Sequence, residues 1–220
     1  MNLLADLYRF VVNDWWIAVP LLLCSVLTIA VVTERWLYIN RNKTDVDRFI
    51  VRLQRELERA NLSGARNLCE QVGGVIGEVA EDGVRLLSVP RVKFEQAFDI
   101  TINLGMRKFE KHLNVLGTIG AVAPFIGLLG TVVGILRSFQ TFAGEGATSN
   151  KLAAEIGFAL IATAAGLIVA IASVVAYNIF QNIVAQFEDD FQLLKLLFLN
   201  FADTAEFEGE VVEESTIPQQ

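Results

Sequence analysis

Three long uncharged runs dominate the hydrophobic pattern of the chain. They cover Trp15–Thr33, Leu113–Leu136 and Ile156–Phe180 and are 19, 24 and 25 residues long. About 20 residues with a rise of about 1.5 Å each cross a hydrocarbon core of about 30 Å, so each run is long enough for one span. The pattern therefore predicts an all-α protein with three transmembrane helices.

The first run is expected to remain as a span rather than to be removed as a signal peptide. It is long, and Glu34, Arg35 and Trp36 follow it where a cleavage site would need small residues. Aromatic side chains of the kind found at membrane interfaces bracket this run: Trp15, Trp16, Trp36 and Tyr38.

The distribution of basic residues predicts the orientation in the membrane. Of the 18 Lys and Arg residues, 14 lie between Arg35 and Lys111, and loops rich in these residues stay in the cytoplasm. Three spans then leave the N-terminus on the outer side of the membrane and the C-terminus in the cytoplasm.

These considerations divide the chain into eight segments. They are a periplasmic N-terminus (1–14), transmembrane helix 1 (15–33), a cytoplasmic helical segment (34–112), transmembrane helix 2 (113–136), a periplasmic loop and helix start (137–155), transmembrane helix 3 (156–180), a cytoplasmic helix (181–203) and an acidic tail (204–220). The tail contributes much of the net charge of −7, and its glutamates predict a solvated, poorly ordered segment.

The cytoplasmic segment predicts several helices. Val46, Ile50, Leu53 and Leu57 recur at helical spacing, and Arg52 and Glu56 are spaced as an i,i+4 ion pair. Breaks are expected at 61–64 and at 73–74, which hold Asn-Leu-Ser-Gly and Gly-Gly. From Pro90 to Ser138 no strong stop signal lies outside the second run, which predicts one helix of about 49 residues, on the order of 70 Å long.

An apolar seam continues beyond the third run. Its steps alternate between four and three residues, as in a coiled coil: Val184, Phe187, Phe191, Leu194, Phe198 and Phe201. Packing against the helix that begins at Pro90 and self-association with another copy both explain this seam.

Small residues gather in the second and third runs. Within a bilayer, helices are held together by close packing of small residues rather than by hydrophobic burial. The residues expected to pack are Pro124, Gly127, Gly130 and Gly134 in the second run and Ala162, Gly166 and Ala170 in the third.

Thr131 and Thr163 lie beside these small residues. Each hydroxyl has two explanations: a hydrogen bond to the carbonyl one turn back in its own helix, or a place in a wet lining where it contacts water or an ion. Spacing alone does not separate the two.

The second and third runs contain no Asp, Glu, Lys, Arg or His. Membrane proteins that move protons use an ionisable group at membrane depth, so a partner would have to supply it. Glu155, at the outer end of the third span, is the nearest candidate in the chain, and an i,i+4 pair with Lys151 is its alternative role. The only histidine, His112, is expected to cap a helix or lie at the interface.

Other chemistry is not indicated. Nothing in the sequence predicts an enzyme, a metal site or a cofactor. The Gly-rich stretch 127–134 lacks the Gly-Lys-Ser/Thr ending of a phosphate-binding loop. The acidic composition gives no support to nucleic-acid binding, and Cys24 and Cys69 do not form a disulfide framework.

Two stretches carry a family resemblance. LGTIGAVAPFIGLLGTVVGILRSF (116–139) and EIGFALIATAAGLIVAIASVVAYNIF (155–180) resemble the ExbB/TolQ/MotA proton-channel family, most of all its three-span ExbB/TolQ branch. The resemblance implies a homo-oligomer, a pentamer in this family, around a single-span ExbD/TolR-like partner whose membrane aspartate carries protons. Thr131 and Thr163 would line the surroundings of that aspartate, and proton flow would drive mechanical work on the partner.

The sequence departs from the family pattern at two positions. The acidic residue of the family's third span falls on Phe158, and Ala172 stands where proline is usual. The sequence therefore does not define the route that a proton would take. Two alternatives to the motor remain: a membrane scaffold that conducts nothing, and a relative of the flagellar-type stator.

Overall fold

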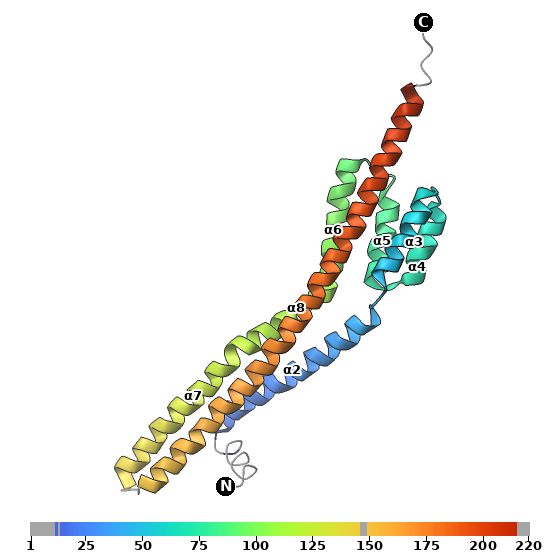
Figure 1. The fold of residues 1–220 in the computed structure, drawn as a ribbon. Coiled ribbons are helices and arrows are strands. Elements are labelled where there is room, and N and C mark those ends of the chain that lie inside the picture. Colours follow the sequence, from blue (N-terminus) through green and yellow to red (C-terminus); the bar gives the residue numbers. More distant parts are fainter. Residues whose placement is uncertain (1–11, 13, 146–148, 215–220) are drawn as a thin grey trace. The chain divides into compact units, whose positions relative to one another are not determined.

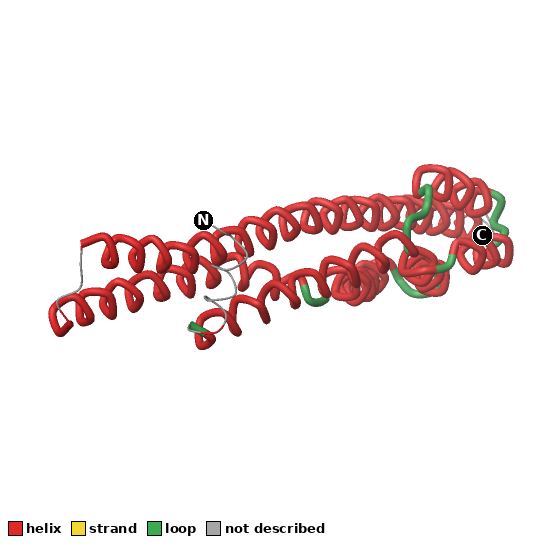
Figure 2. Tube along the Cα trace, turned by 90° about the horizontal axis from the view of Figure 1, so that it is seen from below, coloured by secondary structure: helices red, strands yellow, loops and turns green. Residues whose placement is uncertain are grey.

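The computed structural model describes residues 12, 14–145 and 149–214, and helices are the only long regular elements in these ranges (Figure 1). They are α2 (Trp15–Arg41), α3 (Val46–Glu58), α4 (Leu62–Val72), α5 (Gly74–Leu86), α6 (Arg91–Glu110), α7 (Leu113–Glu145) and α8 (Ser149–Glu214). Short loops join α3, α4, α5 and α6 (Figure 2). The all-α prediction is confirmed.

The chain forms two compact units. The first unit comprises Met1–Arg35 and His112–Gln181, and the second comprises Trp36–Lys111 and Asn182–Gln220. Three stretches within the described ranges are long and apolar enough to cross a membrane: Trp15–Glu58, which includes α2, Leu113–Ala143 within α7, and Leu152–Ala202 within α8. They contain the three runs that the hydrophobic pattern singles out.

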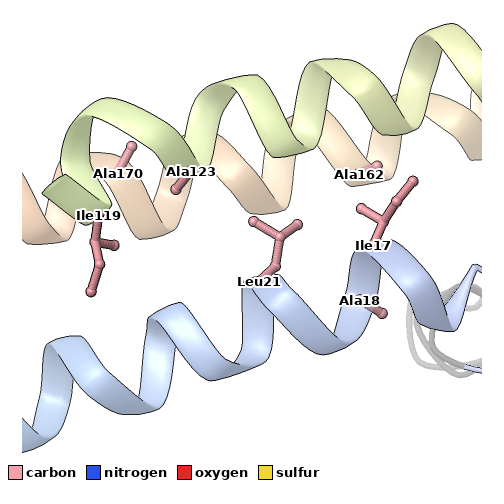
Figure 3. Packing of buried hydrophobic residues seen from close by; sticks show 7 residues of the cluster. All are labelled: Ile17, Ala18, Leu21, Ile119, Ala123, Ala162 and Ala170. Atoms are coloured by element: carbon pink, nitrogen blue, oxygen red, sulfur yellow. The ribbon is translucent and has the colours of Figure 1, made fainter.

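The first unit has a small hydrophobic core where α2, α7 and α8 meet. Ile17 and Leu21 of α2 point toward α7 and α8 (Figure 3). The other fully buried members are mostly small: Ala18, Ile119, Ala123, Ala162 and Ala170. Because a bilayer supplies little hydrophobic drive for association, this core depends on the fit of small side chains.

Side-chain caps and a pair of glycines delimit the short helices of the second unit. The Asp45 carboxylate accepts a hydrogen bond from the backbone N–H of Arg48 and caps α3, and Asn61 caps α4 in the same way. Gly73 and Gly74, with φ of 61° and 60°, lie between α4 and the first turn of α5. The left-handed region is easily reached by glycine, so the break expected at 73–74 is confirmed. The break expected at 61–64 lies at 59–61 instead, because residues 62–64 already belong to α4.

The buried face of α3 differs from the predicted one by one position. Val46, Phe49, Leu53 and Leu57 are buried, whereas Ile50 is half-buried. The predicted ion pair between Arg52 and Glu56 does not form, because Glu56 instead accepts a hydrogen bond from Asn61 at 2.8 Å and lies 4.0 Å from Arg59.

The apolar seam of α8 packs within the chain. Phe109 of α6 stacks on Phe187, with ring centroids 4.1 Å apart, and lies 6.4 Å from Phe191. Farther along, the Phe98 and Phe198 rings meet edge to face at 5.5 Å. Of the two explanations of the seam, packing against the helix that follows Pro90 is confirmed.

The predicted single helix from Pro90 to Ser138 is wrong. α6 ends at Glu110 and α7 begins at Leu113, with His112 in the left-handed region at φ 65°. This conformation costs a residue with a side chain about 1–2 kcal/mol, and no glycine or proline marks it in the sequence. The His112 Nδ1 atom lies 2.9 Å from a carboxylate oxygen of Glu34, a contact between distant parts of the chain.

The C-terminal segment also differs from the expectation. α8 continues to Glu214, whereas a poorly ordered tail was expected from residue 204. Residues 215–220 of that tail lie outside the described ranges, as does most of the expected N-terminal segment 1–14.

The aromatic contact between α6 and α8 yields a stability prediction. Phe191 is completely buried, so Phe191→Ala should lower the free energy of unfolding by about 3–5 kcal/mol. Val51→Ala, at a position 48% exposed, is the control and should change it by less than about 0.5 kcal/mol. Thermal unfolding in detergent tests both, and equal effects would contradict the assigned core.

Candidate functional site

Two glycines allow the backbones of α7 and α8 to touch. A methyl group at Gly127 would lie 2.7 Å from the carbonyl oxygen of Ala162, and one at Gly166 would lie 2.6 Å from the carbonyl oxygen of Ala123. Both obstacles are backbone atoms, which cannot turn aside as a side chain can. Only hydrogen therefore fits at either position while the two helices keep this separation.

Two more glycines continue the contact along α7. A methyl group at Gly130 would meet Ala162 Cβ at 2.7 Å and Ile17 Cδ1 at 2.9 Å, and one at Gly134 would meet Ala159 Cβ at 2.7 Å. Gly130 therefore lies where α2 and α8 both reach α7. Of the other predicted packing residues, Ala162 and Ala170 belong to the core cluster, and Pro124 is half-buried within α7.

The two predicted threonines meet at this contact, and their hydrogen bonds differ. Thr131 donates to the carbonyl of Leu128 in its own helix at 2.8 Å. Thr163 donates instead across the helix pair to the carbonyl of Gly127 at 3.1 Å, and its Oγ1 lies 3.4 Å from that of Thr131. Thr131 is therefore hydrogen-bonded to a carbonyl one turn back in its own helix, which was one of the two explanations, whereas Thr163 is not.

The glycine makes the bond across the helices possible. With no side chain on Gly127, the backbone of α8 approaches its carbonyl, whose second lone pair remains available besides the one used within the helix. Thr131 is 6% exposed, and Thr163 is half-buried. The result is a pair of neighbouring hydroxyl groups: the Thr131 proton is donated within its own helix, and the single Thr163 proton is shared between the Gly127 carbonyl and the Thr131 oxygen.

A third hydroxyl and a carboxylate lie farther toward the ends of the same helix pair. Ser138 is 3% exposed and donates to the carbonyl of Gly134 at 2.9 Å. α7 and α8 run antiparallel with Gly134 against Ala159, so Ser138 and Glu155 each lie one turn beyond this contact. Glu155 is half-buried, and the pair predicted with Lys151 stays a prediction because the Lys151 side chain lies outside the described part.

Phe158 is half-buried and lies one turn before Ala162 on α8. Its ring packs against the core cluster around Ile17 and Leu21. The position where the family resemblance leads one to expect an acidic side chain is thus filled by an aromatic ring in contact with apolar groups.

Charged side chains in the first unit are found near the ends of its helices. Arg137 donates to Asp14 at 3.0 Å and lies 5.7 Å above the Trp16 ring. Glu34 is hydrogen-bonded to His112, and this bond, together with the one from Arg35, holds the pKa of the Glu34 carboxyl below its ordinary value. His112 therefore contacts a carboxylate, and the capping or interfacial role expected for it stays a prediction.

Sequence reasoning missed one buried polar contact. The Thr28 and Ser173 hydroxyls, from α2 and α8, lie 2.7 Å apart, and Thr28 donates to the carbonyl of Cys24 at 2.9 Å. Because that bond uses the Thr28 proton, Ser173 is the donor between the two hydroxyls. The only signal in the sequence was a hydroxyl within each apolar run.

No metal site is found among the described residues, where no three side chains of His, Cys, Asp or Glu come together. What the helix pair offers is hydrogen bonding by neutral hydroxyl groups, which orient water or a carboxyl group but do not titrate themselves. A proton carrier would have to come from Glu155 or from another chain.

Comparison with known proteins gives the family. The model of the MotA/TolQ/ExbB proton channel family matches residues 71–193, more than half of the chain. The biopolymer transport protein ExbB-like 1 of Synechocystis is 31% identical over 177 residues, which cover 78% of this chain and 69% of that protein. The chain belongs to the MotA/TolQ/ExbB proton channel family.

Further relatives identify the branch. ExbB of Neisseria gonorrhoeae is 51% identical over 74 residues, covering 33% of this chain and 34% of that protein. TolQ of Haemophilus influenzae is 39% identical over 97 residues, covering 44% of this chain and 42% of that protein. The matched segment spans less than half of either relative. With its three apolar helices, the chain is a multi-pass membrane protein of the ExbB/TolQ branch.

The glycine contact yields a prediction with a control on the same helix. Gly166→Ala should lower the free energy of unfolding of the first unit by about 1–3 kcal/mol, because its methyl group overlaps the Ala123 carbonyl. Gly157→Ala meets nothing within 4 Å and should be neutral or stabilise by up to about 1 kcal/mol, because alanine favours the helix. Thermal unfolding in detergent compares them, and a Gly166→Ala protein as stable as the control would contradict the close contact.

Proposed function

We propose that this chain is the channel subunit of a proton-driven motor in the bacterial inner membrane. Proton flow would do mechanical work on a single-span ExbD/TolR-like partner and so energise outer-membrane transport or other envelope processes. Each proton yields about 2.3 kcal/mol per 100 mV of membrane potential, so useful work requires repeated proton steps.

One observation carries the proposal: the Thr131 and Thr163 hydroxyls meet between two spans that contain no ionisable side chain. The 3.4 Å separation of their oxygens places two groups that donate and accept hydrogen bonds at a position where the remaining surroundings are apolar. Water or a protonated carboxyl group beside them would find partners there and nowhere else along 121–134, whose other side chains are apolar. The titrating group would be the partner's aspartate.

The exposed apolar side chains of α7 and α8 are a second reason to propose a membrane-spanning partner. Many large apolar side chains of α7 and α8 remain exposed within the first unit, among them Phe125 at 69% and Ile168 at 69%. Exposed groups of this kind suit lipid or other spans. We propose that several copies, five as in the family, form a ring around the partner, with the N-terminus in the periplasm and the C-terminus in the cytoplasm.

Glu155 is proposed as the proton acceptor at the outer end of the route. It lies one turn beyond the contact of Gly134 with Ala159, on the helix face that continues from Thr163. In this proposal Glu155 takes the role of the family's acidic residue, whose position is occupied here by Phe158, a side chain that cannot exchange protons.

The competing function is a membrane scaffold that conducts nothing. The packing of Phe158 against the core cluster favours it, since this position then has a purely structural role. A motor and a scaffold differ in what the loss of a hydroxyl group does.

Replacing each threonine by valine tests the motor. Thr131→Val and Thr163→Val keep the shape of the side chain and remove one hydrogen bond each, which should lower stability by only about 1 kcal/mol and leave assembly intact. Proton flux should fall about tenfold, the effect of about 1.4 kcal/mol on a barrier. The measurement is dye-detected proton entry into vesicles that contain the chain purified together with its partner.

The control for these variants is Thr118→Val, also in α7. Thr118 is exposed and donates to the carbonyl of Asn114 in its own helix at 2.8 Å, so its loss should leave the flux unchanged. Full flux in both Thr131→Val and Thr163→Val would show that the hydroxyl pair lines no proton route and would favour the scaffold.

Glu155→Gln tests the outer acceptor separately. The amide has the size of the carboxylate but cannot carry a proton at neutral pH, so the flux should fall about tenfold or more. A pH profile of the flux distinguishes a titrating role from a structural one. An unchanged rate and profile would remove Glu155 from the route while leaving the threonine assignment intact.

A further inference from the structure

A cleft lined by arginines lies between α3 and α4, within the second unit. It has a volume of about 320 Å³, and the side chains that matter most are Arg52 and Arg55 from α3, Arg59 directly after α3, and Asn67 and Gln71 from α4. This cleft is unrelated to the helix pair described above.

The fold of α3 brings the three arginines to one side. Val46, Phe49, Leu53 and Leu57 form the buried face of this helix. Positions 52 and 55 are three residues apart and share the opposite, exposed face, and Arg59, also exposed, follows at the C-terminal end of the helix. Burial of the apolar face therefore fixes the helix surface that lines the cleft.

The positive charge in the cleft is only partly neutralised. Glu56 is its one acidic lining residue, and its carboxylate is shared by Asn61 at 2.8 Å and Arg59 at 4.0 Å. Among the residues with described side chains, Arg52 and Arg55 form no ion pair. Other arginines nearby do: Arg48 pairs with Asp45 at 2.9 Å and Arg66 with Glu81 at 3.0 Å.

The opposite wall supplies neutral hydrogen-bonding groups. Asn67 and Gln71 are one turn apart on α4, and both amide side chains can donate as well as accept. Among the described side chains, Arg52 and Arg55 thus have no ion-pair partner, and Arg59 shares Glu56 with Asn61. These three guanidinium groups and two amides line one cleft in a chain whose net charge is −7.

We propose that this cleft binds a phosphate-bearing anion. The planar fork of a guanidinium group matches two oxygens of one phosphate, and several such groups together favour an anion with many oxygens over a single carboxylate. The volume accommodates a diphosphate. The same chemistry is found in a free phosphate compound and in the headgroup of an anionic lipid.

Two titrations distinguish these sources. The full-length protein in a neutral, phosphate-free detergent is titrated with inorganic diphosphate by calorimetry at an ionic strength of about 0.15 M, where long-range attraction is largely screened. In parallel, the protein is placed in bilayer discs of phosphatidylcholine with or without phosphatidylglycerol, and the lipid that remains bound after extraction is identified by mass spectrometry. Diphosphate binding indicates a free ligand, and selective retention of phosphatidylglycerol indicates a headgroup.

Variants locate the binding. R52Q/R55Q should weaken whichever interaction is found by about tenfold or more, the effect of losing charge-assisted hydrogen bonds. R52K/R55K keeps the positive charge but loses the planar guanidinium groups that can bind two oxygens at once, and it should give an intermediate affinity. The matched control is R48Q/R85Q, which also removes two exposed arginines, each paired with a nearby aspartate at 2.9 and 2.7 Å and outside the cleft.

The outcomes decide the proposal. Binding that is lost in R52Q/R55Q and kept in R48Q/R85Q supports it. Absence of binding by the wild type in both titrations overturns it, and so does an equal loss in both double variants, which would indicate a general effect of charge. None of these binding experiments measures proton flux, so they test the anion site independently of the proposed motor function.

Discussion

The close approach of α7 and α8 is the constraint on which the first unit depends. In water, burial of apolar groups would press two such helices together, but lipid tails are as apolar as the side chains, so association requires direct packing. Gly127 and Gly166 remove the side chains that would hold the backbones apart, and Gly130 leaves room for Ile17 of α2. The glycines that weaken an isolated helix are therefore what allows three helices to share one core.

The same constraint creates the chemistry. Once the carbonyl of Gly127 is open to α8, Thr163 can donate to it at 3.1 Å, and this bond brings its hydroxyl to within 3.4 Å of Thr131. A side chain at position 127 would block both contacts. The close packing of α7 and α8 at Gly127 is thus also what brings the two hydroxyl groups together. The proposed proton route therefore depends on the separation of the helices as well as on the threonines.

Much of the fold could be predicted from the sequence, because the length of an apolar run, its composition and the spacing of its small residues are local properties. The three apolar helices, the glycine break at 73–74 and the rows of small residues on α7 and α8 are of this kind. The failures share a cause. The break at His112 has no glycine or proline to announce it and involves Glu34, and Glu56 is bonded to Asn61 rather than to Arg52. In each case a partner outside the predicted local pattern decided the outcome.

The acceptor of the Thr163 hydrogen bond is tested most directly by a structure of the protein in a lipid bilayer that resolves side chains. The quantity to measure is the distance from Thr163 Oγ1 to the carbonyl oxygen of Gly127. The account predicts a hydrogen bond close to 3.1 Å, with the two backbones in contact at Gly127 and Gly166. A Thr163 hydroxyl bonded instead to the carbonyl of Ala159 in its own helix, with α7 and α8 held apart, would contradict it.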